Sequence, residues 1–125
     1  MPGRVLVVED EVIVGMLIED MLGELGLEVA ALSSHLDEAV AYALTLSIDV
    51  AVLDVNLNGK KSYPVADALT SRGIPFLFAT GYGAKILVPP YDVIPTLQKP
   101  FKFVDLKQIL DAVLTVERPA PMARP

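Results

Sequence analysis

The stretch "DVAVLDVNLNG", Asp49 to Gly59, decides how this chain folds. Four apolar residues follow one another in it, so a strand built from them shows hydrophobic side chains on both of its faces. Antiparallel strands with one solvated face alternate apolar and polar residues instead. The stretch therefore predicts a strand inside a parallel sheet that is covered on both sides, and this strand ends in a carboxylate, Asp54.

Other segments have the composition of strands in the same sheet, and patterns typical of helices separate them. The strand segments are "RVLVV" (4–8), "LEVAAL" (27–32), "IPFLFA" (74–79) and "VIPTLQ" (93–98). The helical patterns occupy 11–25, 36–44, 64–73 and 106–113. This alternation predicts a doubly wound α/β fold, in which helices cover both faces of a five-stranded parallel sheet.

A fourth helix is poorly specified between the last two strands. Only five residues, "AKILV", separate Gly83 from Pro89, and Pro90 follows. Isolated helices of this length are marginal, and proline removes a donor and clashes with the preceding turn. We expect a short or irregular fourth helix.

Composition excludes several classes of function. The chain has 125 residues, is 53% hydrophobic and carries a net charge of −6, which argues against direct binding of nucleic acid. It has no cysteine, so it makes no disulfide and no thiolate site. Its single histidine, His35, excludes histidine-rich metal sites and Ser-His-Asp triads.

The ends and the hydropathy indicate one domain without membrane insertion. No apolar run approaches the roughly 18 residues of a membrane helix, and the N-terminus lacks the features of a signal peptide. We therefore expect a cytoplasmic protein. We assign residues 1–117 to the domain and 118–125 to a flexible, proline-rich tail.

Ionisable and hydroxyl-bearing residues stand at or just after the ends of the predicted strands. Glu9 and Asp10 follow the first strand, Asp54 ends the third, Thr80 follows the fourth and Lys99 the fifth. Because parallel strands end at one edge of the sheet, all of these residues should share that edge. Three carboxylates at about 4 Å repel one another by about 4 kcal/mol per pair at an effective dielectric constant near 20, unless they protonate or bind a cation.

Oxygen ligands without nitrogen or sulfur favour Mg²⁺, so the edge predicts a phosphoryl-transfer site with a carboxylate nucleophile. Each residue also has a simpler interpretation. Glu9 and Asp10 could be ordinary acids at a helix N-terminus, Asp54 and Thr80 could be caps, and Lys99 could lie on the surface. Their joint occurrence favours the functional interpretation.

The chain resembles the receiver domain of two-component response regulators over about Val5 to Val116. The motifs "VLVVEDE", "AVLDVNLNG", "FATG" and "QKPF" carry the resemblance, in this order and each after a strand. The resemblance implies the flavodoxin-like strand order 2-1-3-4-5. It also implies a phosphoprotein of signal transduction rather than an enzyme acting on other substrates, since such a domain catalyses only its own phosphorylation and dephosphorylation.

The resemblance assigns roles residue by residue. Asp54 would accept a phosphoryl group from the phosphohistidine of a histidine kinase or phosphotransfer protein, and would slowly lose it by hydrolysis. Thr80 and Lys99 would contact the phosphoryl oxygens. Mg²⁺ would be bound by side chains and one backbone carbonyl, from Glu9, Asp10, Asp54 and Asn56. The Lys99–Pro100 peptide bond would be cis, and the 80–103 region would switch to alter binding of a downstream signalling protein.

One motif connects this chain to a narrower group of receivers, and one position departs from the pattern of the family. "FLFATGYG" resembles the "FAT GUY" receivers, which often lack an output domain and are associated with stress response in alphaproteobacteria. The switch aromatic of many receivers is replaced by Thr96, and Tyr82 could supply a ring instead. Two rival functions stay open: a constitutive protein-binding pseudo-receiver, and a Mg²⁺-dependent phosphatase, which would need a general acid and a substrate pocket.

Overall fold

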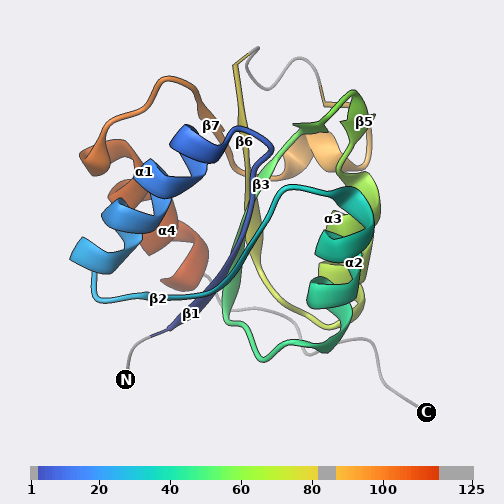
Figure 1. Ribbon diagram of the computed structural model, residues 1–125, viewed down its shortest axis with the longest axis horizontal. Coiled ribbons are helices and arrows are strands. Elements are labelled where there is room, and N and C mark those ends of the chain that lie inside the picture. Colours follow the sequence, from blue (N-terminus) through green and yellow to red (C-terminus); the bar gives the residue numbers. More distant parts are fainter. Residues whose placement is uncertain (1–2, 82–86, 116–125) are drawn as a thin grey trace.

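The computed structural model describes residues 3–81 and 87–115, and these form a parallel sheet between two layers of helices (Figure 1). The sheet has five strands in the order β2-β1-β3-β6-β7, and every neighbouring pair is parallel. The strands are β1 (Arg4–Val8), β2 (Glu28–Ser33), β3 (Val50–Asp54), β6 (Phe76–Thr80) and β7 (Thr96–Gln98). This arrangement confirms the predicted doubly wound fold and its strand order 2-1-3-4-5.

Each face of the sheet is covered by two helices. The helices are α1 (Val12–Glu24) and α4 (Phe103–Thr115) on one face, and α2 (Leu36–Thr45) and α3 (Tyr63–Ser71) on the other (Figure 1). All five residues of β3 are buried, because its alternate side chains enter two separate cores. Val50 and Val52 pack toward α1 and α4, while Ala51 and Leu53 pack toward α2 and α3. The uninterrupted apolar run therefore reflects burial on both faces of the sheet, as predicted.

A small hairpin follows β3, where the sequence analysis expected only a polar loop. Strand β4 (Asn56–Leu57) pairs with β5 (Lys60–Lys61) through the turn residues Asn58 and Gly59. Both turn residues have positive φ, 52° and 84°, as a two-residue type I′ turn requires. The Asn-Gly pair is a strong hairpin signal, so the sequence did contain the information for this element.

In the segment before β7 the structure describes residues 87–95, so most of the predicted short fourth helix, at 84–88, lies outside the described residues. Among the described residues between β6 and β7, only the 3-10 turn η2 (Tyr91–Val93) is helical. The ring of Tyr91 stacks on that of Tyr63, with centroids 4.0 Å apart and planes 3° from parallel. The Tyr91 hydroxyl donates to Oδ1 of Asp67 at 2.8 Å, and the Val88 N–H donates to the Tyr63 hydroxyl at 3.3 Å. These contacts hold residues 88–91 against α3.

Several further expectations concern the ends and the connections. The Lys99–Pro100 bond is cis, as expected, and Pro89–Pro90 is also cis. The predicted tail and domain boundary, as well as Tyr82, lie outside the described residues. In the part of the chain that is described, no helix has both the length and the apolar character needed to cross a membrane.

Candidate phosphoryl-transfer site

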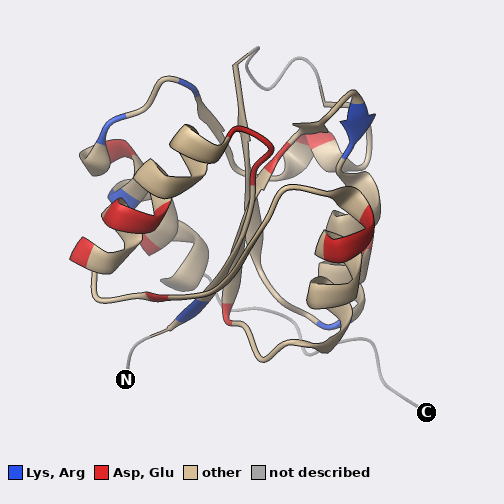
Figure 2. Ribbon diagram, in the orientation of Figure 1, with Lys and Arg blue, Asp and Glu red and all other residues tan. Residues whose placement is uncertain are grey.

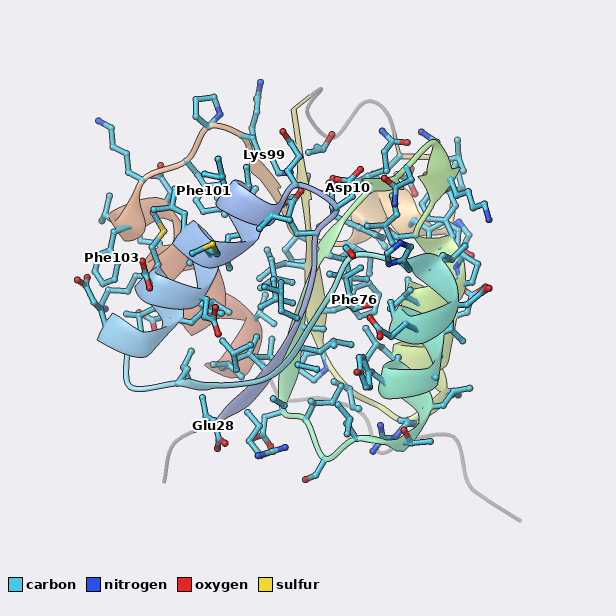
Figure 3. All side chains as sticks on the ribbon, viewed as in Figure 1. Asp10, Glu28, Phe76, Lys99, Phe101 and Phe103 are labelled. Atoms are coloured by element: carbon cyan, nitrogen blue, oxygen red, sulfur yellow. The ribbon has the colours of Figure 1, made fainter. Side chains whose placement is uncertain are left out.

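The carboxyl ends of the strands bring the predicted site residues to one edge of the sheet. Glu9 and Asp10 directly follow β1, Asp54 is the last residue of β3, and Thr80 is the last residue of β6. Asp10 and Lys99 lie at this edge in Figure 3, at the opposite end of the sheet from Glu28. An open cavity of about 430 Å³ lies here, and its lining residues are Asp10, Glu11, Asp54, Asn56, Thr80, Gly81 and Lys99.

Three carboxylates form a compact cluster beside this cavity. One oxygen each from Glu9, Asp10 and Asp54 lies within 4.8 Å of the other two. Glu9 is 2% exposed and Asp54 8% exposed, whereas Asp10 is half-buried. The red loop between β1 and α1 in Figure 2 carries two of these acids. The predicted concentration of negative charge is therefore present, and it is largely shielded from solvent.

Lys99 contacts two of the three carboxylates. Its Nζ donates to Oε1 of Glu9 at 2.6 Å and lies 3.3 Å from Oδ2 of Asp54. Burial lowers the pKa of Lys99, but the bond to Glu9 and the charge of Asp54 raise it more, so the ammonium form is favoured. The other oxygen of Glu9, Oε2, accepts the Glu11 N–H at 3.1 Å. Both oxygens of this buried side chain are thus engaged.

The two remaining carboxylates have opposite tendencies to ionise. Burial and the charge of Glu9 raise the pKa of Asp54 to about 7, although Lys99 lowers it. Burial also raises the pKa of Asp10, but its hydrogen bonds lower that pKa more, and the bond from the Asn58 N–H has the largest effect among them. The pKa of Asp10 therefore lies below its usual range. Without a cation, Asp54 is therefore partly protonated near neutral pH, while Asp10 carries a charge.

This set of ligands fits a hard divalent cation. Mg²⁺ prefers oxygen ligands, usually keeps several waters, and is typically bound through one or two carboxylates. The site offers carboxylate oxygens from three residues and an open cavity that admits water. A bound cation would also offset the charge of Glu9, which adds to the effect of burial in raising the pKa of Asp54.

Comparison with known proteins identifies the family. The response regulator receiver domain family matches residues 5–111. The chain belongs to this family.

Its relatives include a longer regulator and solved chains of about its own length. This receiver is 30% identical to the transcriptional regulatory protein PdtaR of Mycobacterium tuberculosis over 109 residues, which are 84% of this chain and 53% of that protein. The chain thus spans about half the length of the curated relative. SdrG from Sphingomonas melonis Fr1 is 39% identical, with a TM-score of 0.82 over 91% of this chain and 98% of that one.

Two further structures differ in the state of their site. SdrG has also been solved in a BeF3-activated conformation. The sequence in that structure is 40% identical to this one, and the TM-score is 0.78 over 90% of this chain and 96% of that one. The receiver domain of histidine kinase PA1611 from Pseudomonas aeruginosa has magnesium coordinated in its active-site cleft. It shares the fold, with a TM-score of 0.76 at 24% identity over 93% of this chain and all of that one.

The strand ends of this receiver position Thr80 and Lys99 together. Thr80 is buried, lines the same cavity as Asp54, and accepts the backbone N–H of Lys99 on its carbonyl at 2.8 Å. Of the predicted switch residues, Thr96 is half-buried and donates its hydroxyl to the Ile94 carbonyl at 3.0 Å, and Pro100 is exposed. The ring that many receivers carry at the position of Thr96 has no counterpart there.

Three contacts were missed by sequence reasoning, two of them in this site and one at α3. They are the Glu9–Lys99 bond, the Asn58–Asp10 bond and the Tyr63–Tyr91 stack. The Asn-Gly turn could have indicated the second of these, because it predicts the hairpin that carries Asn58. The first and third join residues that are far apart in the chain, and no local pattern signals them.

Proposed function

We propose that this receiver domain accepts a phosphoryl group on Asp54 from a phosphohistidine of a histidine kinase or phosphotransfer protein. The observation that carries the proposal is the position of Asp54, which lines an open cavity between the ammonium of Lys99 and the carboxylates of Glu9 and Asp10. A nucleophile needs access, and the transferring group needs positive charge around its oxygens. Asp54 and Lys99 line the same cavity, which supports both requirements.

The transfer balances without further reactants. A carboxylate oxygen of Asp54 attacks phosphorus and an O–P bond forms. The N–P bond of the phosphohistidine breaks, and its electron pair stays on the ring, whose other nitrogen carries a proton, so that neutral imidazole leaves. Lys99 moves from Asp54 toward the new phosphoryl oxygens, and the Thr80 hydroxyl donates to another of them. Later, water attacks the phosphorus, which releases inorganic phosphate and restores the carboxylate.

Asp10 and Asp54 would hold the Mg²⁺ directly and Glu9 directly or through water, with the backbone carbonyl of Asn56 as a further ligand. The cation supplies charge neutralisation for the attacking carboxylate and the incoming phosphoryl group. The magnesium in the PA1611 receiver and the BeF3-activated form of SdrG support this assignment by similarity.

The surface beside the cavity suits a protein donor. A second, mainly apolar cavity of about 390 Å³ shares Glu11, Gly81 and Lys99 with the first. It continues over Val14, Leu17 and Phe101. Helix α1 also leaves large apolar side chains exposed next to it, those of Val12, Ile13, Met16 and Leu17. Exposed apolar surface of this kind is typical of protein interfaces.

Phosphorylation with a small donor tests the chemistry. Incubation with acetyl phosphate and Mg²⁺ should add one phosphoryl group, detected by intact mass. Asp54→Ala should abolish it, whereas Asp37→Ala, at an exposed acid on α2, should not. Label retained by Asp54→Ala would refute the assignment. The alternative, a constitutive binding module, predicts an unlabelled wild-type chain whose partner binding ignores Mg²⁺ and phosphate mimics.

A second measurement tests the cation site. Mg²⁺ should raise the melting temperature of the wild-type chain by mass action, and Asp10→Asn should remove most of this rise. An unchanged rise in Asp10→Asn would place the cation elsewhere.

A further inference from the structure

The hairpin that follows Asp54 is joined to two other loops at the same edge of the sheet. The backbone N–H of Asn58 donates to Oδ2 of Asp10 at 3.0 Å. Its side-chain Nδ2 donates to the carbonyl oxygen of Ser34 at 3.1 Å. Asp10 follows β1 and Ser34 follows β2, so one residue connects the loops after three different strands.

The backbone conformation of Asn58 is unusual and is needed for this contact. Its φ of 52° is the only positive value at a non-glycine residue in the described part of the chain. Glycine would adopt the turn more readily, but it has no side chain to reach Ser34. Asparagine tolerates the left-handed region and adds an amide donor, so it satisfies both the turn and the connection.

We propose that Asn58 is a positioning residue for the divalent-cation site. By holding one oxygen of Asp10 while its own side chain is anchored to Ser34, Asn58 leaves the second Asp10 oxygen available to the cation in a fixed place. This inference rests on the proposed function, because it concerns the same Mg²⁺ site. It differs from that proposal in assigning part of the affinity to a residue that does not bind the cation.

The geometry predicts an effect on the choice of cation as well as on affinity. Mg²⁺ demands nearly ideal octahedral geometry with ligands at about 2.0–2.1 Å, whereas Ca²⁺ accepts longer and more variable distances. Loosening the position of Asp10 should therefore reduce the affinity for Mg²⁺ more than the affinity for Ca²⁺. A general loss of stability or a change in charge would affect the two ions similarly.

Two substitutions loosen the connection in different ways. Asn58→Gly keeps the backbone N–H and the turn, but removes the bond to Ser34. Gly59→Ala leaves Asn58 intact and strains the turn through its φ of 84°, with no steric clash, since nothing lies within 4 Å of the added Cβ. Arg72→Met is the matched control, because it removes one side-chain bond to a backbone carbonyl (Arg72 to Ala43, 2.8 Å) that joins α3 to α2.

The experiment titrates the full chain with Mg²⁺ and, separately, with Ca²⁺, and measures binding by the shifts of the backbone amide NMR signals. The melting temperature of each variant without metal is measured as well. Asn58→Gly and Gly59→Ala should weaken Mg²⁺ binding by about 3- to 10-fold, at or below the usual effect of losing an outer-shell partner. They should lower the Mg²⁺/Ca²⁺ selectivity, whereas Arg72→Met should change neither quantity.

Unchanged Mg²⁺ affinity in Asn58→Gly would overturn the inference, and so would an equal loss for both cations. If the wild-type chain itself bound no Mg²⁺, the proposed function would fail first, and this inference with it. The wild-type titration therefore separates the two failures.

Discussion

Lys99 donates its short hydrogen bond, 2.6 Å, to Glu9, and its Nζ lies farther, 3.3 Å, from Asp54. Glu9 is the more deeply buried partner, with 1% of its side chain exposed against 11% for Asp54. Desolvated charges need a close partner more than hydrated ones, so Lys99 primarily neutralises Glu9. This leaves Asp54 incompletely paired and open to a phosphoryl group.

Removal of Lys99 should therefore destabilise the metal-free protein strongly. Lys99→Met leaves Glu9 and Asp54 buried without a cation, and breaking such a pair costs roughly 3 kcal/mol. Urea unfolding in EDTA near pH 8 measures this loss. The control Lys107→Met removes an exposed pair with Asp111 and should change the free energy of unfolding by less than about 0.5 kcal/mol. Equal effects of the two substitutions would contradict the buried pairing.

The raised pKa of Asp54 predicts an unusual pH dependence of stability without metal. Below about pH 4 the carboxyl is protonated in both the folded and the unfolded chain. Between there and about pH 7 the unfolded chain has released the proton while the folded chain keeps it, so the stability contribution falls as pH rises.

Comparison with Asp54→Asn isolates this effect, because asparagine does not titrate. Between pH 5 and pH 8 in EDTA, the wild-type chain should lose about 2 kcal/mol of unfolding free energy relative to Asp54→Asn. Saturating Mg²⁺ should reduce the difference. Parallel stability curves of the two proteins in EDTA would show that the pKa of Asp54 is not raised.

The exposed apolar face of α1 predicts a difference between two phosphodonors. Ile13 is 81% exposed, and Ile13→Glu would place a charge in the proposed interface without disturbing the core. Phosphotransfer from a phosphorylated histidine kinase should slow at least about 10-fold, as expected for a central interface residue.

Labelling of Ile13→Glu by acetyl phosphate should keep the wild-type rate, because that donor needs no docking surface. The matched control is Leu44→Glu, at an exposed apolar residue of α2, which should leave both rates unchanged. If Ile13→Glu and Leu44→Glu slowed the kinase reaction alike, α1 would not be the docking face.

The tyrosine stack predicts how the segment before β7 is held. Tyr91→Ala removes both the stacking on Tyr63 and the bond to Asp67, and should lower the free energy of unfolding by about 1 to 2 kcal/mol. Tyr91→Phe keeps the ring and should cost less than half as much. Hydrogen exchange at Val88, whose N–H donates to Tyr63, should accelerate in Tyr91→Ala only. Equal exchange in the two variants would mean that the stack does not hold the segment.

The sheet and the edge where the site forms can be predicted from the amino-acid sequence. The unbroken apolar run of β3 indicates burial on both faces, which a parallel sheet between helices provides. The same rule places Glu9, Asp10, Asp54, Thr80 and Lys99 together, because parallel strands end on one side. These conclusions depend on local periodicity and on the position of a residue relative to its own strand.

The pairing of these residues, by contrast, depends on contacts that form in the folded chain. Lys99 stands 90 positions after Glu9, and its choice between Glu9 and Asp54 depends on the register of four strands, β1, β3, β6 and β7, and on the burial of each carboxylate. The Asn58–Asp10 bond likewise needs the hairpin to fold back across the edge of the sheet. Differences of a few tenths of an ångström in the distances between these remote residues affect the charges of their side chains. No pattern along the chain encodes such differences.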